Sequence, residues 1–197
     1  MKLIKIFLVC IAVMFSGTLL GQKIKVMDGD VKALKGVTAI KIQYDYSDLA
    51  VGKFEVEDEY IEKKVAEMNE DEAGTGDHWK EAWFADRPDR YEPKFEELFS
   101  KYTEPIESGQ DVDSDVVMNV HTTFIEPGFN VGVARKPAYI DLEVTFYKGG
   151  ESVAVVSLLK SPGNAAMGFD FDTGLRISEA YAKAGKSLGG FLMKNLK

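Results

Sequence analysis

The chain has little cysteine and little histidine, and both shortages exclude common kinds of site. Its single cysteine, Cys10, cannot form a disulfide within the chain, so packing and hydrogen bonding must hold the core. Its two histidines, His78 and His121, lie far apart and have no second histidine or cysteine at ligand spacing. We therefore expect no metal site and no cofactor. No group of residues in the sequence matches a known catalytic motif in full.

Acidic residues outnumber basic ones, with 32 aspartates and glutamates against 24 lysines and arginines. The formal net charge is −8, and loss of Lys2 and Lys5 with an amino-terminal leader would make it −10. This acidity disfavours binding to nucleic acid or to anionic lipid. We expect a protein, a glycan or a small molecule as the partner.

The first 21 residues are typical of a secretory signal peptide. Lys2 and Lys5 precede an apolar run over residues 6–20, which is shorter than the roughly 20 residues of a membrane-spanning helix. We predict cleavage before Gln22 and a periplasmic or secreted protein with no membrane attachment afterwards. An uncleaved anchor stays open, because Leu19 is bulky for a position near the cleavage site.

Residues 22–197 are expected to form a single domain. Alternating apolar residues predict strands over residues 37–46, 116–124, 140–146 and 152–159, with a short strand at 23–26. Gly149-Gly150 is suited to a tight turn between the last two strands, so three antiparallel strands in series are predicted.

A helical period appears in the middle of the chain and at its end. It predicts helices over residues 56–70, 77–85 and 173–195, and a further helix beginning at Pro93, with a break at Arg87-Pro88. The final helix is rich in alanine, glycine and serine, which would let it lie close on a sheet. The expected fold class is α+β: a mixed, mostly antiparallel sheet of about four or five strands packed against helices, including a long carboxy-terminal one.

Aromatic and arginine side chains alternate in the helical middle of the chain. Exported proteins use such flat apolar rings with polar neighbours to bind sugars or peptides. The candidate ligand-binding residues are Trp79, Trp83, Arg87, Arg90 and Tyr91. The alternative is that these rings form core, because a spacing of four residues places them on one helix face.

Three short motifs match known sites only loosely. Residues 180–187 copy a P-loop spacing within a helical pattern, and Asp111, Asp113 and Asp115 lack the glycine and glutamate of a calcium loop. Asp172-Thr173-Gly174 copies the core of an aspartic-protease motif, but an N-cap of the final helix explains it more simply.

From Val116 to Lys197, three strands are followed by a long helix rich in small residues. This order resembles small uncharacterised domains of Gram-negative envelope and secreted proteins, and it is similar at fold level to the α/β domain of CsgG and the amino-terminal domain of TolB. The resemblance implies a binding or assembly role in the envelope.

The resulting expectation is an exported, non-catalytic binding or envelope-assembly module. Two alternatives stay open. One is a hydrolase that acts on glycan or peptide through carboxylates such as Asp141, Glu143, Asp170 or Asp172. The other is an inhibitor of an envelope enzyme.

Overall fold

A computed structural model describes residues 22–131, 134–163 and 172–197. The main sheet has seven strands in the order β1-β9-β8-β5-β2-β4, with β3 paired to the end of β5. A separate small hairpin is formed by β6 and β7. The strand bounds are β1 (Lys23–Gly29), β2 (Ala39–Asp45), β3 (Ala50–Val51), β4 (Glu107–Gly109), β5 (Val116–Glu126), β6 (Phe129–Asn130), β7 (Arg135–Lys136), β8 (Ala138–Lys148) and β9 (Glu151–Gly163).

The predicted α+β class is confirmed, and so are the three antiparallel strands in series, which are β5, β8 and β9. The sheet is mixed, because β2 runs parallel to both β5 and β4. It has more strands than expected. Strands β3 and β4 are only two and three residues long, so they are too short to show a period of two. They pair through backbone hydrogen bonds, which leave no pattern of side chains in the sequence.

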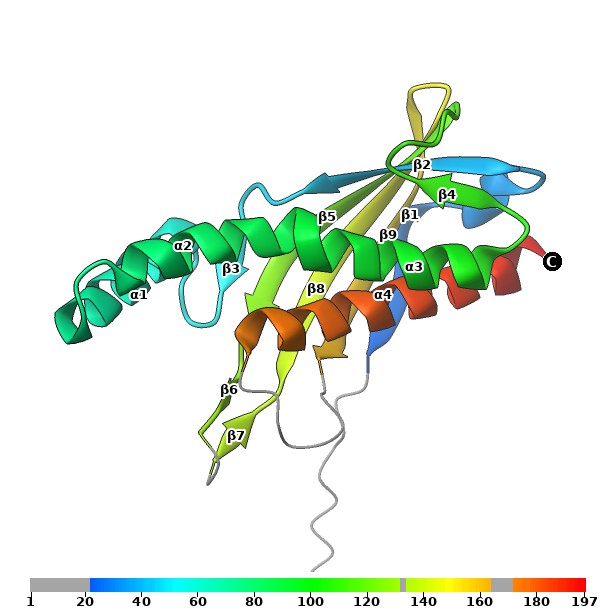
Figure 1. Ribbon diagram of the computed structural model, residues 1–197. Coiled ribbons are helices and arrows are strands. Elements are labelled where there is room, and N and C mark those ends of the chain that lie inside the picture. The colour runs from blue at the N-terminus through cyan, green and yellow to red at the C-terminus, as the bar shows by residue number, and fades with distance from the viewer. Residues whose placement is uncertain (1–21, 132–133, 164–171) are drawn as a thin grey trace, which may run out of the picture.

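In the described part of the chain, helices cover only one face of the sheet. The buried side chains of the strands point to this face, where α3 (Glu92–Thr103) and α4 (Thr173–Leu196) lie side by side (Figure 1). Intervening residues such as Lys41, Gln43 and Glu143 point to the opposite face. No helix in the described part of the chain is long and apolar enough to cross a membrane.

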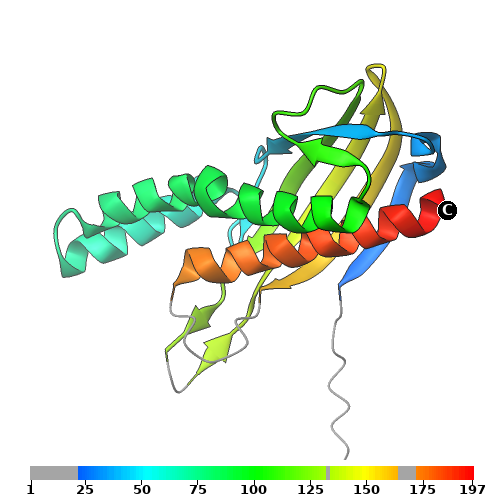
Figure 2. The same ribbon diagram turned by 45° about the vertical axis from the view of Figure 1, so that its right-hand side comes forward.

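Helices α1 (Glu57–Asp71) and α2 (Thr75–Asp86) form a hairpin, here called the arm, which projects past the sheet (Figure 2). Rings at the base of the arm pack on one another. Tyr60 contacts Trp79 and Trp83 with ring centroids 5.8 Å and 5.3 Å away, and Phe54 contacts Tyr60 at 5.9 Å. This aromatic cluster fixes the arm to the rest of the domain.

The predicted break at Arg87-Pro88 is wrong. The chain continues from α2 into α3 through a π-helical turn, η2 (Arg87–Tyr91), in which the Glu92 N–H donates to the carbonyl of Arg87 five residues before it. A proline removes one donor from a helix, and the wider turn accommodates the changed hydrogen bonding. Helices α2, η2 and α3 therefore form one long, bent helix.

The small residues of α4 do allow a close approach, and the partner is α3. A Cβ on Gly185 would lie 2.2 Å from the carbonyl oxygen of Phe95, and one on Gly189 would lie 3.0 Å from Cβ of Tyr102. The later glycine of α4 meets the later residue of α3, so the two helices run parallel (Figure 1).

The predicted signal peptide, residues 1–21, lies outside the described residues, as does Asp170.

We predict that Gly185→Ala destabilises the domain by about 1–3 kcal/mol, because the new methyl group would collide with the backbone of α3. Gly190→Ala is the matched control. A Cβ at position 190 meets nothing within 4 Å, so alanine should stabilise the helix by about 0.5–1 kcal/mol. Urea denaturation measures both changes. Shifts of the same sign in the two variants would contradict the assigned contact.

Candidate functional site

The candidate site, here called the tryptophan hollow, has a volume of about 300 Å³ and lies where α2, η2 and the beginning of α4 meet. It combines aromatic, acidic and basic side chains from segments that are distant in the sequence. Trp79, Trp83 and Arg90, three of the predicted ligand-binding residues, lie in its wall. The complete lining is Trp79, Ala82, Trp83, Asp86, Arg90, Asp172, Thr173 and Gly174.

Arg90 connects the two carboxylates of this site. Its Nε lies 3.1 Å from Oδ1 of Asp86, and its Nη1 lies 2.9 Å from Oδ2 of Asp172. Asp172 also caps α4, because its Oδ1 accepts a hydrogen bond from the Leu175 N–H at 3.1 Å. The predicted N-cap is confirmed. The helix start is thus fixed to the π turn by one guanidinium.

Gly174 lets the helix start come this close. A Cβ at this position would lie 2.0 Å from Oδ2 of Asp86 and 2.8 Å from Nη1 of Arg90. A larger residue would therefore displace the Asp86–Arg90 pair. The glycine of the protease-like motif has a steric role at the edge of the hollow.

The two carboxylates have pKa shifts of opposite sign. Burial raises the pKa of Asp86, and the nearby Arg90 charge opposes that rise. Burial also acts to raise the pKa of Asp172, but hydrogen bonds from Arg90 and from the Leu175 backbone N–H outweigh it and lower the pKa. Two carboxylates and one guanidinium leave a formal charge of −1, so the hollow does not favour an anionic ligand.

The two tryptophans contribute differently. Trp83 is 4% exposed, and its Nε1 donates to Oε1 of Glu57 at 2.6 Å. Trp79 is half-buried, with its ring centroid 5.5 Å from that of Trp83 and the planes tilted by 30°. Trp83 supports the wall from behind, while Trp79 presents ring surface to the hollow.

Arg87 and Tyr91 do not line the hollow. The Nη2 of Arg87 lies 2.6 Å from both carboxylate oxygens of Glu57, and its guanidinium lies over the ring of Tyr46 at 4.3 Å. Tyr91 is 1% exposed and stacks on Tyr181 with ring centroids 5.1 Å apart. Tyr91 and Trp83 are therefore core residues, as the alternative interpretation expected. Arg87 holds the arm in place through Glu57.

A buried polar network lies behind the site, under the beginning of α3. The Glu92 carboxylate accepts hydrogen bonds from the hydroxyl of Tyr46 at 3.3 Å and from Nε2 of Gln110 at 3.1 Å. Burial raises the pKa of Glu92. Nearby, the hydroxyls of Tyr181 and Thr122 are 2.6 Å apart. This network fixes the register of α3 and α4 on the sheet.

Sequence reasoning missed Asp86 as a site residue. Asp86 and Arg90 are four residues apart on one helical face, a spacing that signals an ion pair. Asp172 was considered only as a cap or as a hydrolase carboxylate. Asp172 and Arg90 are 82 residues apart in the sequence, so no local sequence pattern predicts their contact.

The other carboxylates considered for a hydrolase lie elsewhere. Asp141 and Glu143 alternate with the buried Ile140 and Leu142, so they lie on the face of the sheet away from the helices. Oδ1 of Asp141 accepts a hydrogen bond from the Lys160 N–H at 2.6 Å. Asp172 lies on the helix side. These three residues therefore do not form one site.

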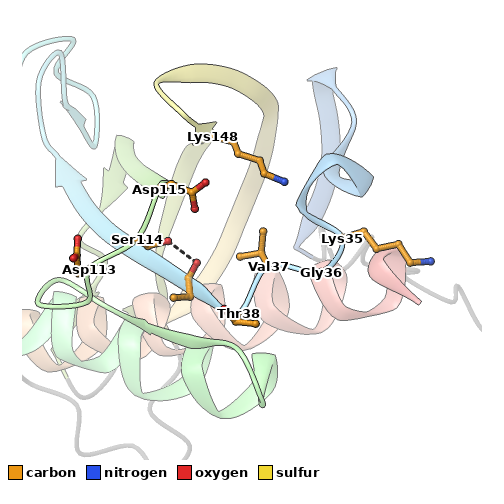
Figure 3. Close-up of a pocket in the computed structure, with 9 residues that line it drawn as sticks. Lys35, Gly36, Val37, Thr38, Asp113, Ser114, Asp115 and Lys148 are labelled. Atoms are coloured by element: carbon orange, nitrogen blue, oxygen red, sulfur yellow. Dashed lines mark hydrogen bonds between the residues drawn. The ribbon is translucent and has the colours of Figure 1, made fainter.

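A second hollow, of about 520 Å³, lies where β2 and β5 begin. Figure 3 shows Lys148 and Asp115 beside it and the side chain of Lys35 pointing away. Lys148 Nζ donates to the carbonyl of Ala33, and the Ser114 hydroxyl donates to that of Ala39. No aromatic ring lines this second hollow, so it lacks the flat apolar surface that the tryptophan hollow presents to a ligand.

Within the described residues, no three acidic, histidine or cysteine side chains gather as metal ligands. A scan against models of protein families finds no match, and searches of curated proteins and of solved structures find no relative.

We predict that Trp83→Ala destabilises the domain by about 3–5 kcal/mol, because it removes a buried ring and leaves Glu57 without one donor. Trp79→Ala should cost less, because this ring is only half-buried and forms no hydrogen bond with another residue of the described part of the chain. Thermal and urea denaturation compare the variants. An equal loss of stability in both would contradict the division of roles between the two rings.

Proposed function

We propose that the protein is an exported, non-catalytic binding module that recognises a glycan in the tryptophan hollow. The supporting observation is the half-buried ring of Trp79 beside an array of donors and acceptors that is already fixed by Arg90, Asp86 and Asp172.

Sugars match this chemistry. One face of a sugar ring carries C–H groups that pack on an aromatic ring, and its hydroxyls both donate and accept hydrogen bonds. Carboxylate oxygens supply acceptors, and the guanidinium supplies donors. Because the ion pairs hold these groups in position before a ligand arrives, little side-chain entropy is lost on binding. The charge of −1 suits a neutral sugar better than an acidic one.

Export is the second part of the proposal. Its support is the sequence of residues 1–21, with two lysines, an apolar run and Gly21 before Gln22. The resemblance of residues 116–197 to CsgG and TolB domains agrees with a place in the envelope. Assembly with an envelope protein, or inhibition of an envelope enzyme, would use the same compartment.

The alternative is hydrolysis of a glycan by Asp86 and Asp172, whose pKa values move in opposite directions. Such a difference separates a general acid from a base or nucleophile. The Arg90 contacts oppose this role, because a guanidinium disfavours the protonated form that an acid needs. Binding is therefore the function that the geometry favours.

The test is calorimetric titration of the purified protein with a neutral chito-oligosaccharide. We expect saturable binding that Trp79→Ala and Arg90→Ala each weaken about tenfold, because each removes one half of the recognition surface. Tyr102→Ala is the control, since this exposed aromatic residue lies far along α3 and does not line the hollow. Absence of binding by the wild type, or an equal effect of Tyr102→Ala, would contradict the proposed glycan site.

Product analysis on the same mixtures separates binding from hydrolysis. The binding proposal predicts intact oligosaccharide after prolonged incubation. Release of shorter products by the wild type, and its loss in Asp86→Asn, would replace the proposal with the hydrolase alternative.

A further inference from the structure

A third hollow, here called the lysine pocket, lies at the base of the arm on the other side of the aromatic cluster. It has a volume of about 410 Å³ and is formed by the turn after β3, the first half of α1, the end of β5 and β7. Its lining is Val51, Gly52, Lys53, Phe54, Tyr60, Lys64, Glu126, Pro127, Gly128 and Lys136.

The walls of this pocket are fixed by backbone contacts. The Gly52 N–H donates to the carbonyl of Ile125 at 2.9 Å, and the Phe54 N–H donates to that of Val51 at 2.9 Å. On the opposite wall, a Cβ on Gly128 would lie 2.3 Å from the carbonyl oxygen of Lys136. The turn after β3 and the end of β5 are therefore held close to their neighbours before any ligand binds.

The charged side chains that line the pocket are mostly positive, although the chain as a whole is acidic. The single carboxylate, Glu126, is 8% exposed; it accepts from the Gly128 N–H and forms an ion pair with Lys136. Among the described residues, neither Lys53 nor Lys64 forms an ion pair. Three lysines and one glutamate leave a formal charge of +2.

Helix α1 is rich in acidic residues, and it nevertheless presents Tyr60 and Lys64 to this pocket, one turn apart. The neighbouring Lys63 points elsewhere and pairs with Glu67 at 3.1 Å. Burial raises the pKa of Tyr60 to about 12, and the Glu126 charge adds to this shift while Arg176 opposes it. The Tyr60 hydroxyl therefore stays protonated at neutral pH and can donate a hydrogen bond.

We propose that the lysine pocket binds a small organic anion, with its phosphate or carboxylate group between Lys53 and Lys64 and its apolar body against Phe54, Tyr60 and Pro127. The site is separate from the tryptophan hollow, where the formal charge is −1. Because Lys53 is exposed and Lys64 is partly exposed, salt screens their charges and binding weakens as salt is added.

Titration of the purified protein with phenyl phosphate, followed by NMR or calorimetry, tests this proposal. We expect saturable binding that Lys64→Gln and Lys53→Gln each weaken about fivefold, as removal of one partly screened charge contact should. Lys63→Gln, one residue away on the same helix, should leave the affinity unchanged. Arg90→Ala should also leave it unchanged, which separates this test from that of the glycan site.

Each of these lysines is surface-accessible, so the variants should keep the melting temperature of the wild type, and circular dichroism checks this. Absence of saturable binding by the folded wild type would overturn the proposal. So would an effect of Lys63→Gln as large as that of Lys64→Gln, because the attraction would then come from the general charge of α1.

Discussion

The close parallel packing of α3 and α4 is the contact on which the rest of the structure depends. Gly185 and Gly189 let the two backbones approach, so that one ordered pair of helices covers the sheet. The same packing stacks Tyr91 on Tyr181 and brings the start of α4 to the π turn. Arg90 then connects Asp86 and Asp172. The tryptophan hollow exists because two segments far apart in the sequence meet at this end of the helix pair.

At the base of the arm, Glu57 joins separate segments of the chain in the way that the α3–α4 contact does elsewhere. It accepts hydrogen bonds from the indole of Trp83 and from Arg87, and Arg87 in turn covers the ring of Tyr46 on the sheet side. A carboxylate at the start of α1 also suits the helix dipole. One acidic residue therefore joins α1, α2 and η2. The two hollows on either side of the aromatic cluster depend on this joint for their shape.

The sequence predicted the parts of the fold that have a regular period. The long strands β5, β8 and β9 and helix α4 show clear alternation or a helical stripe, because each buries one face. Strands β3 and β4 gave no such signal, since strands of two and three residues are too short to show a period of two. The continuous helix through Arg87 and Pro88 was missed because proline normally ends a helix, and a π turn is visible only in the hydrogen bonding.

The candidate site was predictable only in part. Trp79, Trp83 and Arg90 were identified from composition and spacing, and all three line one hollow. The same composition could not separate Trp79 from Trp83, because both lie on one helix face and only tertiary packing buries the second ring. Asp172 was recognisable as a helix cap, whereas its ion pair with Arg90 follows from the parallel packing of α3 and α4. Contacts across 82 positions have no local signature.

We propose that the tryptophan hollow binds a glycan. The most direct measurement is chemical-shift mapping of isotopically labelled protein during addition of a chito-oligosaccharide. We expect the resonances of the Trp79 indole N–H and of the backbone amides of Thr173 and Gly174 to shift most. The indole N–H of Trp83, which donates a hydrogen bond to Glu57, should shift little. Largest shifts on the open face of the sheet, around Asn119 and Glu143, would contradict it.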